Sequence, residues 1–226
     1  MSLKKTPAAI IAAGGSGERA RNATEEVPKQ FRELAGRPLL AWSAAALAEA
    51  GCNPVIVVVP EGHVEEARSL LGDPFICAIG GPTRQSSVSN GLTQVETDRV
   101  IVHDGARPFV TPDLVIRVLE GLPDVDGAVA AIPVDDTVKR VDGDRVLHTV
   151  DRTQLWSVQT PQAFWTERLR VVHKRAEVDG IEATDDAALI ETFGGTVRVV
   201  EGSRTNIKVT HPEDLAMAEH LASRLT

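Results

Sequence analysis

The sequence has no tyrosine and few other aromatic residues, with five phenylalanines and three tryptophans among 226 residues. A hydrophobic core must therefore be built from Val, Ile, Leu and Ala. The two cysteines, Cys52 and Cys77, stand alone and match no metal-ligand or redox spacing. This cysteine usage argues against a disulfide framework and predicts a reduced, cytoplasmic compartment.

Long apolar runs and an excess of basic residues are also missing. No stretch approaches the roughly 18 apolar residues of a membrane span, and the first apolar run is too short for a signal peptide, so we expect no membrane partner. Lys and Arg total 24 against 32 Asp and Glu, which gives a net charge of −8. Such a charge disfavours nucleic acid as a partner. A small anionic substrate remains compatible with it if a few cations converge locally.

Short β-branched runs alternate with segments of helical periodicity along most of the chain. This alternation predicts an α/β fold, with a mostly parallel sheet covered by helices on both faces. The expected strands are Ala8–Ala13, Val55–Val59, Phe75–Ile79, Val100–His103, Ala128–Ile132, Thr196–Val200 and Ile207–Thr210. The expected helices are Leu39–Ala50, Glu61–Leu71, Ser86–Val95, Pro112–Leu122, Thr184–Phe193 and Pro212–Leu225.

One segment departs from this alternation. Asp142-Gly143 lies between the β-prone runs of Thr137–Val150, which is a strong hairpin signal. An isolated two-stranded ribbon is marginal in water, so the hairpin must find another surface. We therefore expect one domain, residues 1–226, with a protruding β-hairpin arm at about residues 134–158 that forms a homodimer. The alternative is a hairpin that folds back on its own domain.

A phosphate site is predicted where the first expected strand runs into the glycines of A-A-G-G-S-G-E-R-A (Ala12–Ala20). Backbone N–H groups in such a turn form a concave nest for phosphate oxygens, and Arg19 and Lys29 add two cations. The dinucleotide fingerprint G-x-G-x-x-[GA] also fits, but its acidic residue about 20 positions later is missing, and Arg37 stands there. A nucleoside triphosphate is therefore favoured over a dinucleotide or a glycine turn with solvated cations.

A second candidate is Asp104, at the end of the expected strand Val100–His103. Ligands of open parallel sheets bind at the carboxyl ends of strands. Asp104 could hold a metal ion on phosphates, or it could cap a helix or pair with Arg107. For His103 we expect a packing or hydrogen-bonding role and not general-base catalysis.

Further candidates are individually unremarkable. The loop Gly80–Ser87 follows another expected strand and could contact a base, while Ser86 or Ser87 could cap the next helix. Arg152, Thr160, Thr184 and Lys208 could be surface charges or helix caps, and Thr184 would suit the N-cap of Asp185–Phe193.

Eight motifs occur in a fixed order: the glycine loop with Arg19, P-K-Q-F, G-G-x-x-R-x-x-S-V, H-D-G-A-R-P, P-V-x-D-T-V-K, R-x-x-L-W-x-x-Q-T-P-Q-x-F, T-D-D-A and N-x-K-V-T-x-P-E-D-L. Together they resemble the bacterial 2-C-methyl-D-erythritol 4-phosphate cytidylyltransferases, over residues 8–222. The resemblance implies a Rossmann-like nucleotidyltransferase fold, a homodimer through the arm and a Mg²⁺-dependent reaction in isoprenoid biosynthesis. CTP and methylerythritol phosphate would give 4-diphosphocytidyl-2-C-methyl-D-erythritol and pyrophosphate.

The resemblance also implies residue roles. Arg19 and Lys29 would stabilise charge on the transferring group, while Arg152 and Lys208 would complete the catalytic set by positioning the acceptor. CTP would be bound by Ala13, Gly14, Gly15, Ser16, Gly17, Gly81, Ser87, Asp104 and Gly105, with Asp104 also at the metal. The acceptor would be bound by Arg152, Thr160, Thr184 and Lys208, with Arg152 reaching in from the neighbouring subunit.

Some positions depart from the family pattern. The glycine loop has an extra glycine beside Gly14 and Ala20 in place of a bulky residue, Gly105 replaces an alanine, and Pro82 replaces a polar residue. Other functions stay open: a cytidylyltransferase for ribitol 5-phosphate or another polyol phosphate, an NAD-dependent dehydrogenase, and a nucleotide sensor without turnover.

Overall fold

A seven-stranded sheet in the order β11-β7-β10-β6-β1-β4-β5 forms the centre of the molecule. The structure is a computed structural model that describes residues 6–14 and 28–224. All strand pairs of this sheet are parallel except those of β10, which runs antiparallel to β6 and β7. The strands are β1 (Ala8–Ala12), β4 (Val55–Val59), β5 (Ile76–Ile79), β6 (Arg99–Asp104), β7 (Gly127–Pro133), β10 (Trp156–Trp165) and β11 (Val197–Glu201). The predicted mostly parallel sheet is confirmed.

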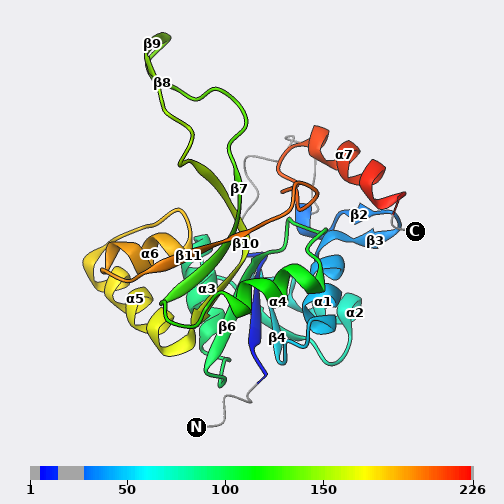
Figure 1. The fold of residues 1–226 in the computed structure, drawn as a ribbon. Helices are drawn as coiled ribbons and strands as arrows, with labels where there is room; N and C mark the ends of the chain where they lie inside the picture. Colours follow the sequence, from blue (N-terminus) through cyan, green and yellow to red (C-terminus); the bar gives the residue numbers. More distant parts are fainter. Residues whose placement is uncertain (1–5, 15–27, 225–226) are drawn as a thin grey trace.

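Helices cover both faces of this sheet (Figure 1). On one face lie α1 (Leu39–Glu49), α2 (Val64–Leu71) and α4 (Pro112–Glu120), and on the other α3 (Arg84–Leu92), α5 (Thr166–Asp179) and α6 (Asp186–Thr192). Successive residues of a strand point to opposite faces, so Ile11 joins the core under the first set and Ile10 the core under the second. Of the helices in the described part of the chain, none has the length and apolarity of a membrane span.

A smaller cluster holds the C-terminal helix α7 (Pro212–Ala222) against the short ribbon β2 (Glu33–Leu34) and β3 (Arg37–Pro38). Arg37, at the position where the dinucleotide fingerprint requires an acidic residue on a second parallel strand, lies in this antiparallel ribbon. The dinucleotide interpretation of the glycine loop therefore loses its structural basis.

The helices that carry predicted site residues begin one or more residues away from the expected caps. Thr83 caps α3, and its hydroxyl and that of Ser86 bond each other's backbone N–H groups at 3.1 and 2.9 Å in a capping box. Asp185 caps α6 by accepting the N–H of Ala188 at 2.9 Å. Ser86 thus takes part in the capping of α3 as predicted, but from inside the helix, because the N-cap is Thr83. The predicted N-cap Thr184 was wrong, and Thr184 lies outside the helix.

The strand β10 and the helix α5 were not predicted, and the expected strand Ile207–Thr210 does not form. Pro161 in the middle of β10 interrupts the strand pattern, because proline cannot donate to the ladder. The β10–β7 register also shifts between Val158 and Gln162. Residues 207–210 instead run as an irregular segment that is tied to the body by the bond from the N–H of Val209 to the carbonyl of Ala106.

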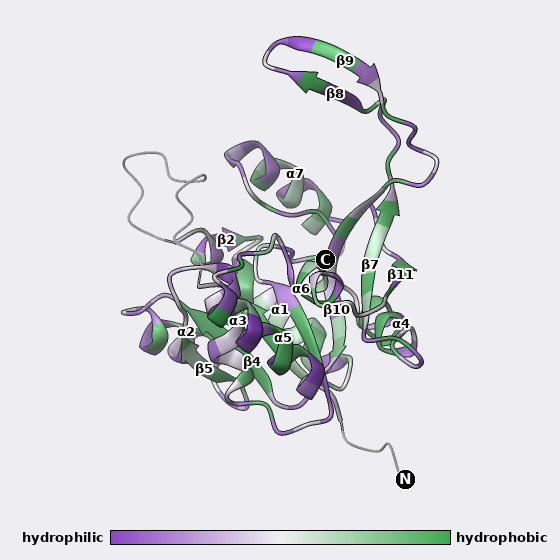
Figure 2. Ribbon diagram, turned by 90° about the vertical axis from the view of Figure 1, so that its left-hand side faces the viewer, coloured by the Kyte–Doolittle hydropathy of each residue, from purple (hydrophilic) through white to green (hydrophobic). Residues whose placement is uncertain are grey.

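A second ribbon, β8 (Lys139–Asp142) and β9 (Arg145–Thr149), projects far from the sheet in both views (Figures 1 and 2). Its turn is Gly143-Asp144, where Gly143 has a φ of +56°, a conformation that favours glycine. Val141, Val146 and Leu147 on this ribbon are more than half exposed, and apolar segments are visible on both of its strands in Figure 2. We call residues 134–158, which include this ribbon, the arm.

Gly91 lies where α3 packs closely against the sheet. A Cβ at this position would lie 2.8 Å from Cγ2 of Ile10 and 3.1 Å from Cγ2 of Val58, and both are stiff, buried β-branched side chains. We expect Gly91→Ala to lower the free energy of unfolding by about 1–2 kcal/mol in urea denaturation, because overpacking outweighs the gain in helix propensity. The matched control is Ser89→Ala on the exposed side of the same helix, for which we expect a change within about 0.5 kcal/mol. A more stable Gly91→Ala protein would contradict the close approach.

Candidate active site

The candidate site lies at the point where the order of successive strands across the sheet changes direction. From β1 the chain continues outward through β4 and β5, and β6 then returns to the other side of β1. Ligands of open α/β sheets bind at the carboxyl ends of strands at such a switch point. The register pairs Ala12 of β1 with Asp104 of β6, so Asp104 lies directly beside the start of the glycine loop.

The predicted CTP-binding residues within the described part come together at this edge. A Cβ on Gly14 would lie 2.5 Å from Oγ of Ser87, and a Cβ on Gly105 would lie 3.1 Å from Cβ of Ala13. Ser87 is fully buried; its hydroxyl accepts the N–H of Gly81 at 3.1 Å. Ser87 therefore fixes the loop that contains Gly81 through this hydrogen bond. Because Gly14 has no side chain, the loop after β1 can approach Ser87 and the loop after β5 closely.

The remaining loop residues are not described. Gly15, Ser16, Gly17 and Arg19 lie outside the described residues. Lys29 belongs to a short 3-10 helix, Lys29–Phe31, but its side chain is likewise outside the description. Its neighbour Gln30 is buried and donates from Nε2 to the carbonyl of Ala13 at 2.5 Å. This bond ties the P-K-Q motif to the start of the glycine loop, a link that sequence reasoning missed.

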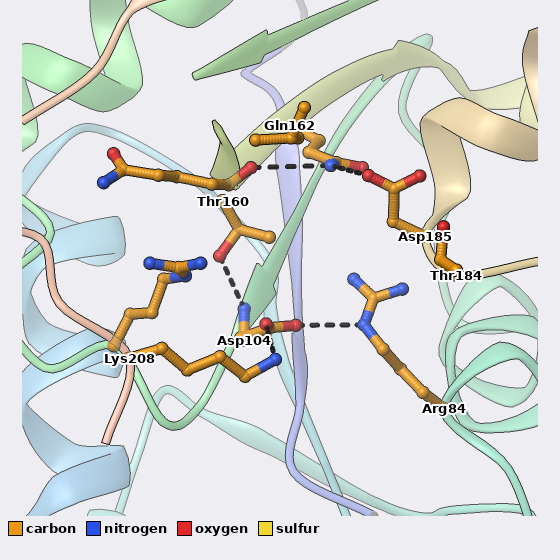
Figure 3. Close-up of a pocket in the computed structure, with 10 residues that line it drawn as sticks. Arg84, Asp104, Thr160, Gln162, Thr184, Asp185 and Lys208 are labelled. Carbon is orange, nitrogen blue, oxygen red and sulfur yellow. Dashed lines mark hydrogen bonds and ion pairs between the residues drawn. The ribbon is translucent and has the colours of Figure 1, made fainter. Parts of the chain in front are cut away.

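A pocket of about 250 Å³ adjoins this edge, and it gathers four predicted residues from distant parts of the chain: Asp104, Thr160, Thr184 and Lys208 (Figure 3). Sequence reasoning had no single-residue signal for any of the last three. The pocket is also lined by residues to which no role had been given, among them Arg84, Gln162 and Asp185. The amide Nε2 of Gln162 donates to Oδ2 of Asp185 at 2.7 Å, which connects β10 to the start of α6 across the pocket.

Asp104 is the electrostatic centre of the pocket. Its Oδ1 accepts Nε of Arg84 at 3.0 Å and its Oδ2 accepts Nζ of Lys208 at 2.7 Å. Burial alone would raise the pKa of the Asp104 carboxyl, but the charges of Arg84 and Lys208 outweigh it and hold the pKa well below its usual value. The alternative pairing with Arg107 is not found among the described residues: Nη1 of Arg107 donates to the carbonyl of Asn206 at 2.8 Å.

Arg84 bridges two carboxylates and is the main site residue that was missed. While Nε holds Asp104, Nη1 donates to Oδ2 of Asp186 at 2.7 Å. Burial would lower the pKa of Arg84, but the charges of Asp186 and Asp104 raise it above its ordinary value. The only sequence signal was its place in G-G-x-x-R, since the two carboxylates it joins are distant in the chain.

His103 is buried and hydrogen-bonded, as predicted. Its Nε2 lies 3.1 Å from the carbonyl of Arg107, which can only accept, so Nε2 carries the proton. Nδ1 then accepts the hydroxyl of Thr160 at 3.1 Å, and the same hydroxyl accepts the N–H of Asp104 at 3.0 Å. Burial lowers the pKa of His103 to about 4, so the ring is neutral near pH 7 and fixes Thr160 and Asp104.

The donor set at this edge suits a metal ion that arrives with phosphates. The described residues include no group of three or more His, Cys, Asp or Glu side chains placed to hold a metal alone. Mg²⁺ is usually held by one or two carboxylates together with substrate phosphates. Asp104 supplies one carboxylate, and its Oδ2 accepts a hydrogen bond from Nζ of Lys208, whose side chain is 42% exposed.

Arg152 lies apart from these residues. It is exposed, between the end of β9 and the start of β10. It is not one of the described residues that line the pocket. Of the four predicted acceptor-binding residues, the structure therefore unites three and leaves Arg152 separate.

Comparison with known proteins gives consistent matches. A family model described as 2-C-methyl-D-erythritol 4-phosphate cytidylyltransferase matches residues 8–224. A protein of that name from Rubrobacter xylanophilus is 46% identical over 220 residues, covering 93% of this chain and 92% of the relative. Another from Halalkalibacterium halodurans is 42% identical over 217 residues, covering 93% and 94%.

Solved structures agree with these matches. The crystal structure of 2-C-methyl-D-erythritol 4-phosphate cytidylyltransferase from Thermus thermophilus is similar with a TM-score of 0.83 and 39% identity, covering 97% of this chain and 100% of that chain. That of 4-diphosphocytidyl-2C-methyl-D-erythritol synthase from Anaerococcus prevotii gives a TM-score of 0.84 at 28% identity, covering 97% and 99%.

The buried neutral His103 predicts a pH dependence of stability. The unfolded chain protonates this histidine below about pH 6.5, whereas the folded protein does so only near pH 4. Between these values the unfolded state binds more protons, so stability falls as the pH falls. We expect His103 to account for about 2–3 kcal/mol of the loss between pH 7 and pH 4.5.

Urea denaturation of wild type and His103→Gln across this range measures the effect, because glutamine keeps one donor and one acceptor but does not titrate. The same replacement at His148 on the exposed arm controls for the substitution itself. Equal pH dependence in wild type and His103→Gln would show that His103 is not the group responsible.

Proposed function

The chain belongs to the 2-C-methyl-D-erythritol 4-phosphate cytidylyltransferase family, a family of nucleotidyltransferases with a Rossmann-like fold, and from this we propose a reaction and a division of roles. The enzyme transfers the cytidylyl group of CTP to 2-C-methyl-D-erythritol 4-phosphate. A phosphate oxygen of the acceptor attacks the α-phosphorus of CTP and forms a new P–O–P bond. The bond to the β-phosphate breaks, and pyrophosphate leaves with its electron pair.

The observation that carries this proposal is the pair of Asp104 and Lys208 in a pocket next to the glycine loops. Nζ of Lys208 lies 2.7 Å from Oδ2 of Asp104, and its side chain is 42% exposed. An incoming phosphate can replace Asp104 as the ion-pair partner of Lys208, and part of the desolvation cost of this ammonium has then already been met in the folded protein. Thr160 and Thr184 line the same pocket. The Thr184 hydroxyl can contact a polyol phosphate, while the Thr160 hydroxyl, which donates to His103 and accepts the N–H of Asp104, keeps one lone pair that can accept a hydroxyl of the polyol. We assign this pocket to the acceptor.

The glycine loops suit the nucleotide. Gly14 and Gly81 belong to loops at adjoining strand ends, and Ser87 holds the second loop from beneath. We propose that backbone N–H groups of Gly14 and Gly81 face CTP, and we assign Ala13, Gly15, Ser16, Gly17 and Gly105 to CTP binding as well. Arg19 and Lys29 would stabilise the charge that develops on the transferring phosphoryl group.

We assign Mg²⁺ to Asp104 and the triphosphate. The metal, when bound, would neutralise charge on the phosphate oxygens. The carboxylate of Asp104 becomes available on one side when Lys208 turns to the acceptor, while Arg84 continues to hold the other oxygen.

The arm and Arg152 suggest a shared site. Val141, Val146 and Leu147 expose apolar side chains on a ribbon that projects away from the rest of the described chain (Figure 2). We propose that this arm forms a homodimer and that Arg152 at its base completes the acceptor site of the neighbouring subunit. The free thiols Cys52 and Cys77 fit an enzyme of the cytoplasm.

A substrate screen tests the reaction. We expect pyrophosphate to be released from CTP in the presence of Mg²⁺ only when methylerythritol phosphate is added, and release to stop with excess EDTA. Ribitol 5-phosphate is the matched alternative acceptor, and CTP alone is the control for hydrolysis. Release with ribitol 5-phosphate and none with methylerythritol phosphate would overturn the acceptor assignment.

Subunit mixing tests the shared site. Lys29→Ala and Arg152→Ala proteins should each be nearly inactive, but their heterodimers should contain one complete site. Random exchange at equal concentrations should restore about a quarter of wild-type activity, because half of the dimers are mixed and each has one intact site of two.

The control mixture is Lys29→Ala with Lys208→Ala, which act in the same site of one chain and should not complement. Absence of rescue in the first mixture, once subunit exchange is verified by mass spectrometry, would assign Arg152 to its own chain.

A further inference from the structure

Arg84 is held from two sides by carboxylates of different elements, of which Figure 3 shows Asp104. Its Nε donates to Oδ1 of Asp104 at the end of β6, and its Nη1 donates to Oδ2 of Asp186 at the start of α6. The third nitrogen, Nη2, is buried with no hydrogen-bond partner among the described residues. The orientation of the guanidinium therefore depends on the two carboxylates.

Asp186 is fixed in turn by a buried histidine. Its Oδ1 lies 2.9 Å from Nε2 of His173 on α5, and the two side chains are only 1% and 2% exposed. An ionised carboxylate can only accept, so Nε2 of His173 donates. Burial would raise the pKa of the Asp186 carboxyl, but the charge of Arg84 and the hydrogen bond from His173 outweigh it and hold the pKa below its usual value, so Asp186 stays ionised. Neither Asp186 nor His173 is among the described residues that line the pocket, and both side chains are almost fully buried.

The two cations on Asp104 differ in mobility. Lys208 reaches Asp104 from an irregular segment with a flexible, 42% exposed side chain, whereas the side chain of Arg84 is 27% exposed and bonded at both ends. A buried carboxylate that loses its only cation is strongly destabilised. Asp104 is only 10% exposed, so Lys208 can leave without stranding a buried charge only while Arg84 stays.

We propose that Asp186 and His173 are positioning residues that fix Arg84 against Asp104, so that Asp104 keeps a charge partner when Lys208 turns to the acceptor's phosphate. The role of Lys208 in this inference rests on the proposed function, whereas the fixing of Arg84 does not. The chain of hydrogen bonds thus runs from His173 on α5 through Asp186 on α6 and Arg84 on α3 to Asp104 at the end of β6. In this proposal these four residues stay in place and only Lys208 moves.

The fixing of Arg84 is measured without any substrate. In wild type the Nε–H of Arg84, enclosed against Asp104, should exchange slowly with solvent in ¹⁵N NMR. In His173→Leu this exchange should be about tenfold faster, as expected when one hydrogen bond to a charged group is lost. His173→Gln keeps an N–H donor for Asp186 and should restore slow exchange. The control is Val172→Ala on the same helix, which is buried without polar contacts and should destabilise the fold without changing this exchange.

Kinetics then test the consequence. His173→Leu should lower kcat/KM for the acceptor about tenfold, with little change in the KM for CTP, and His173→Gln should recover most of the loss. Val172→Ala should stay within about twofold of wild type while it is folded. If His173→Leu does not fold, Arg84→Lys tests the same bridge, because one ammonium cannot span both carboxylates, and it should show the same selective loss.

The outcomes separate the two levels of inference. Wild-type exchange of the Arg84 Nε–H in folded His173→Leu, or wild-type kinetics in Arg84→Lys, would overturn the positioning proposal. So would a Val172→Ala protein with the same kinetic loss. A wild-type protein that is inactive with methylerythritol phosphate would refute the proposed function and leave the exchange result to stand on its own.

Discussion

A carboxylate buried at the end of a central strand has to be paired, and the pairing of Asp104 organises the site. The carboxylate of Asp104 is paired with Arg84 from α3 and with Lys208 from the segment before α7. Its backbone N–H donates to the hydroxyl of Thr160 on β10. Each partner comes from a different part of the chain. The position of the pocket thus depends on correct packing of distant elements, because α3, β10 and the C-terminal segment must all reach the same strand end.

The antiparallel strand β10 makes this convergence possible. It inserts between β6 and β7 and brings Thr160 and Gln162 beside Asp104, which a purely parallel sheet with a crossover helix at that point would not do. The same strand leads back from the arm, so the segment that is proposed to contact a second subunit is continuous with a wall of the pocket. Assembly and site are therefore coupled through one strand in this proposal.

The strands with uninterrupted β-branched runs could be predicted closely, and Val55–Val59 has the expected bounds. The strand β10 was missed because Pro161 and the register shift break its pattern. Helix α5 carried a readable signal, since its buried positions Leu169, Val172 and Ala176 follow helical spacing. For the site, motif order singled out Asp104, Thr160, Thr184 and Lys208, which line one pocket in the structure. It did not predict the bridge from Arg84 to Asp186, because that contact spans 102 positions and no local pattern encodes it.

The acidic balance of the chain is compatible with two polyanionic substrates because two of its pocket cations are already paired. Lys208 and Arg84 are neutralised by Asp104 and Asp186, so in the described part of the pocket these two cations offer little net charge to attract other polyanions. In the proposed mechanism, a phosphate that fits the pocket would take Lys208 from Asp104, and the charge of Asp104 would then be balanced by Arg84 and by a cation that comes with the triphosphate. This arrangement would select for the two substrates together. The acceptor would supply a phosphate for Lys208 and CTP a triphosphate beside Asp104, and only with both present would the charges of Lys208 and Asp104 stay paired.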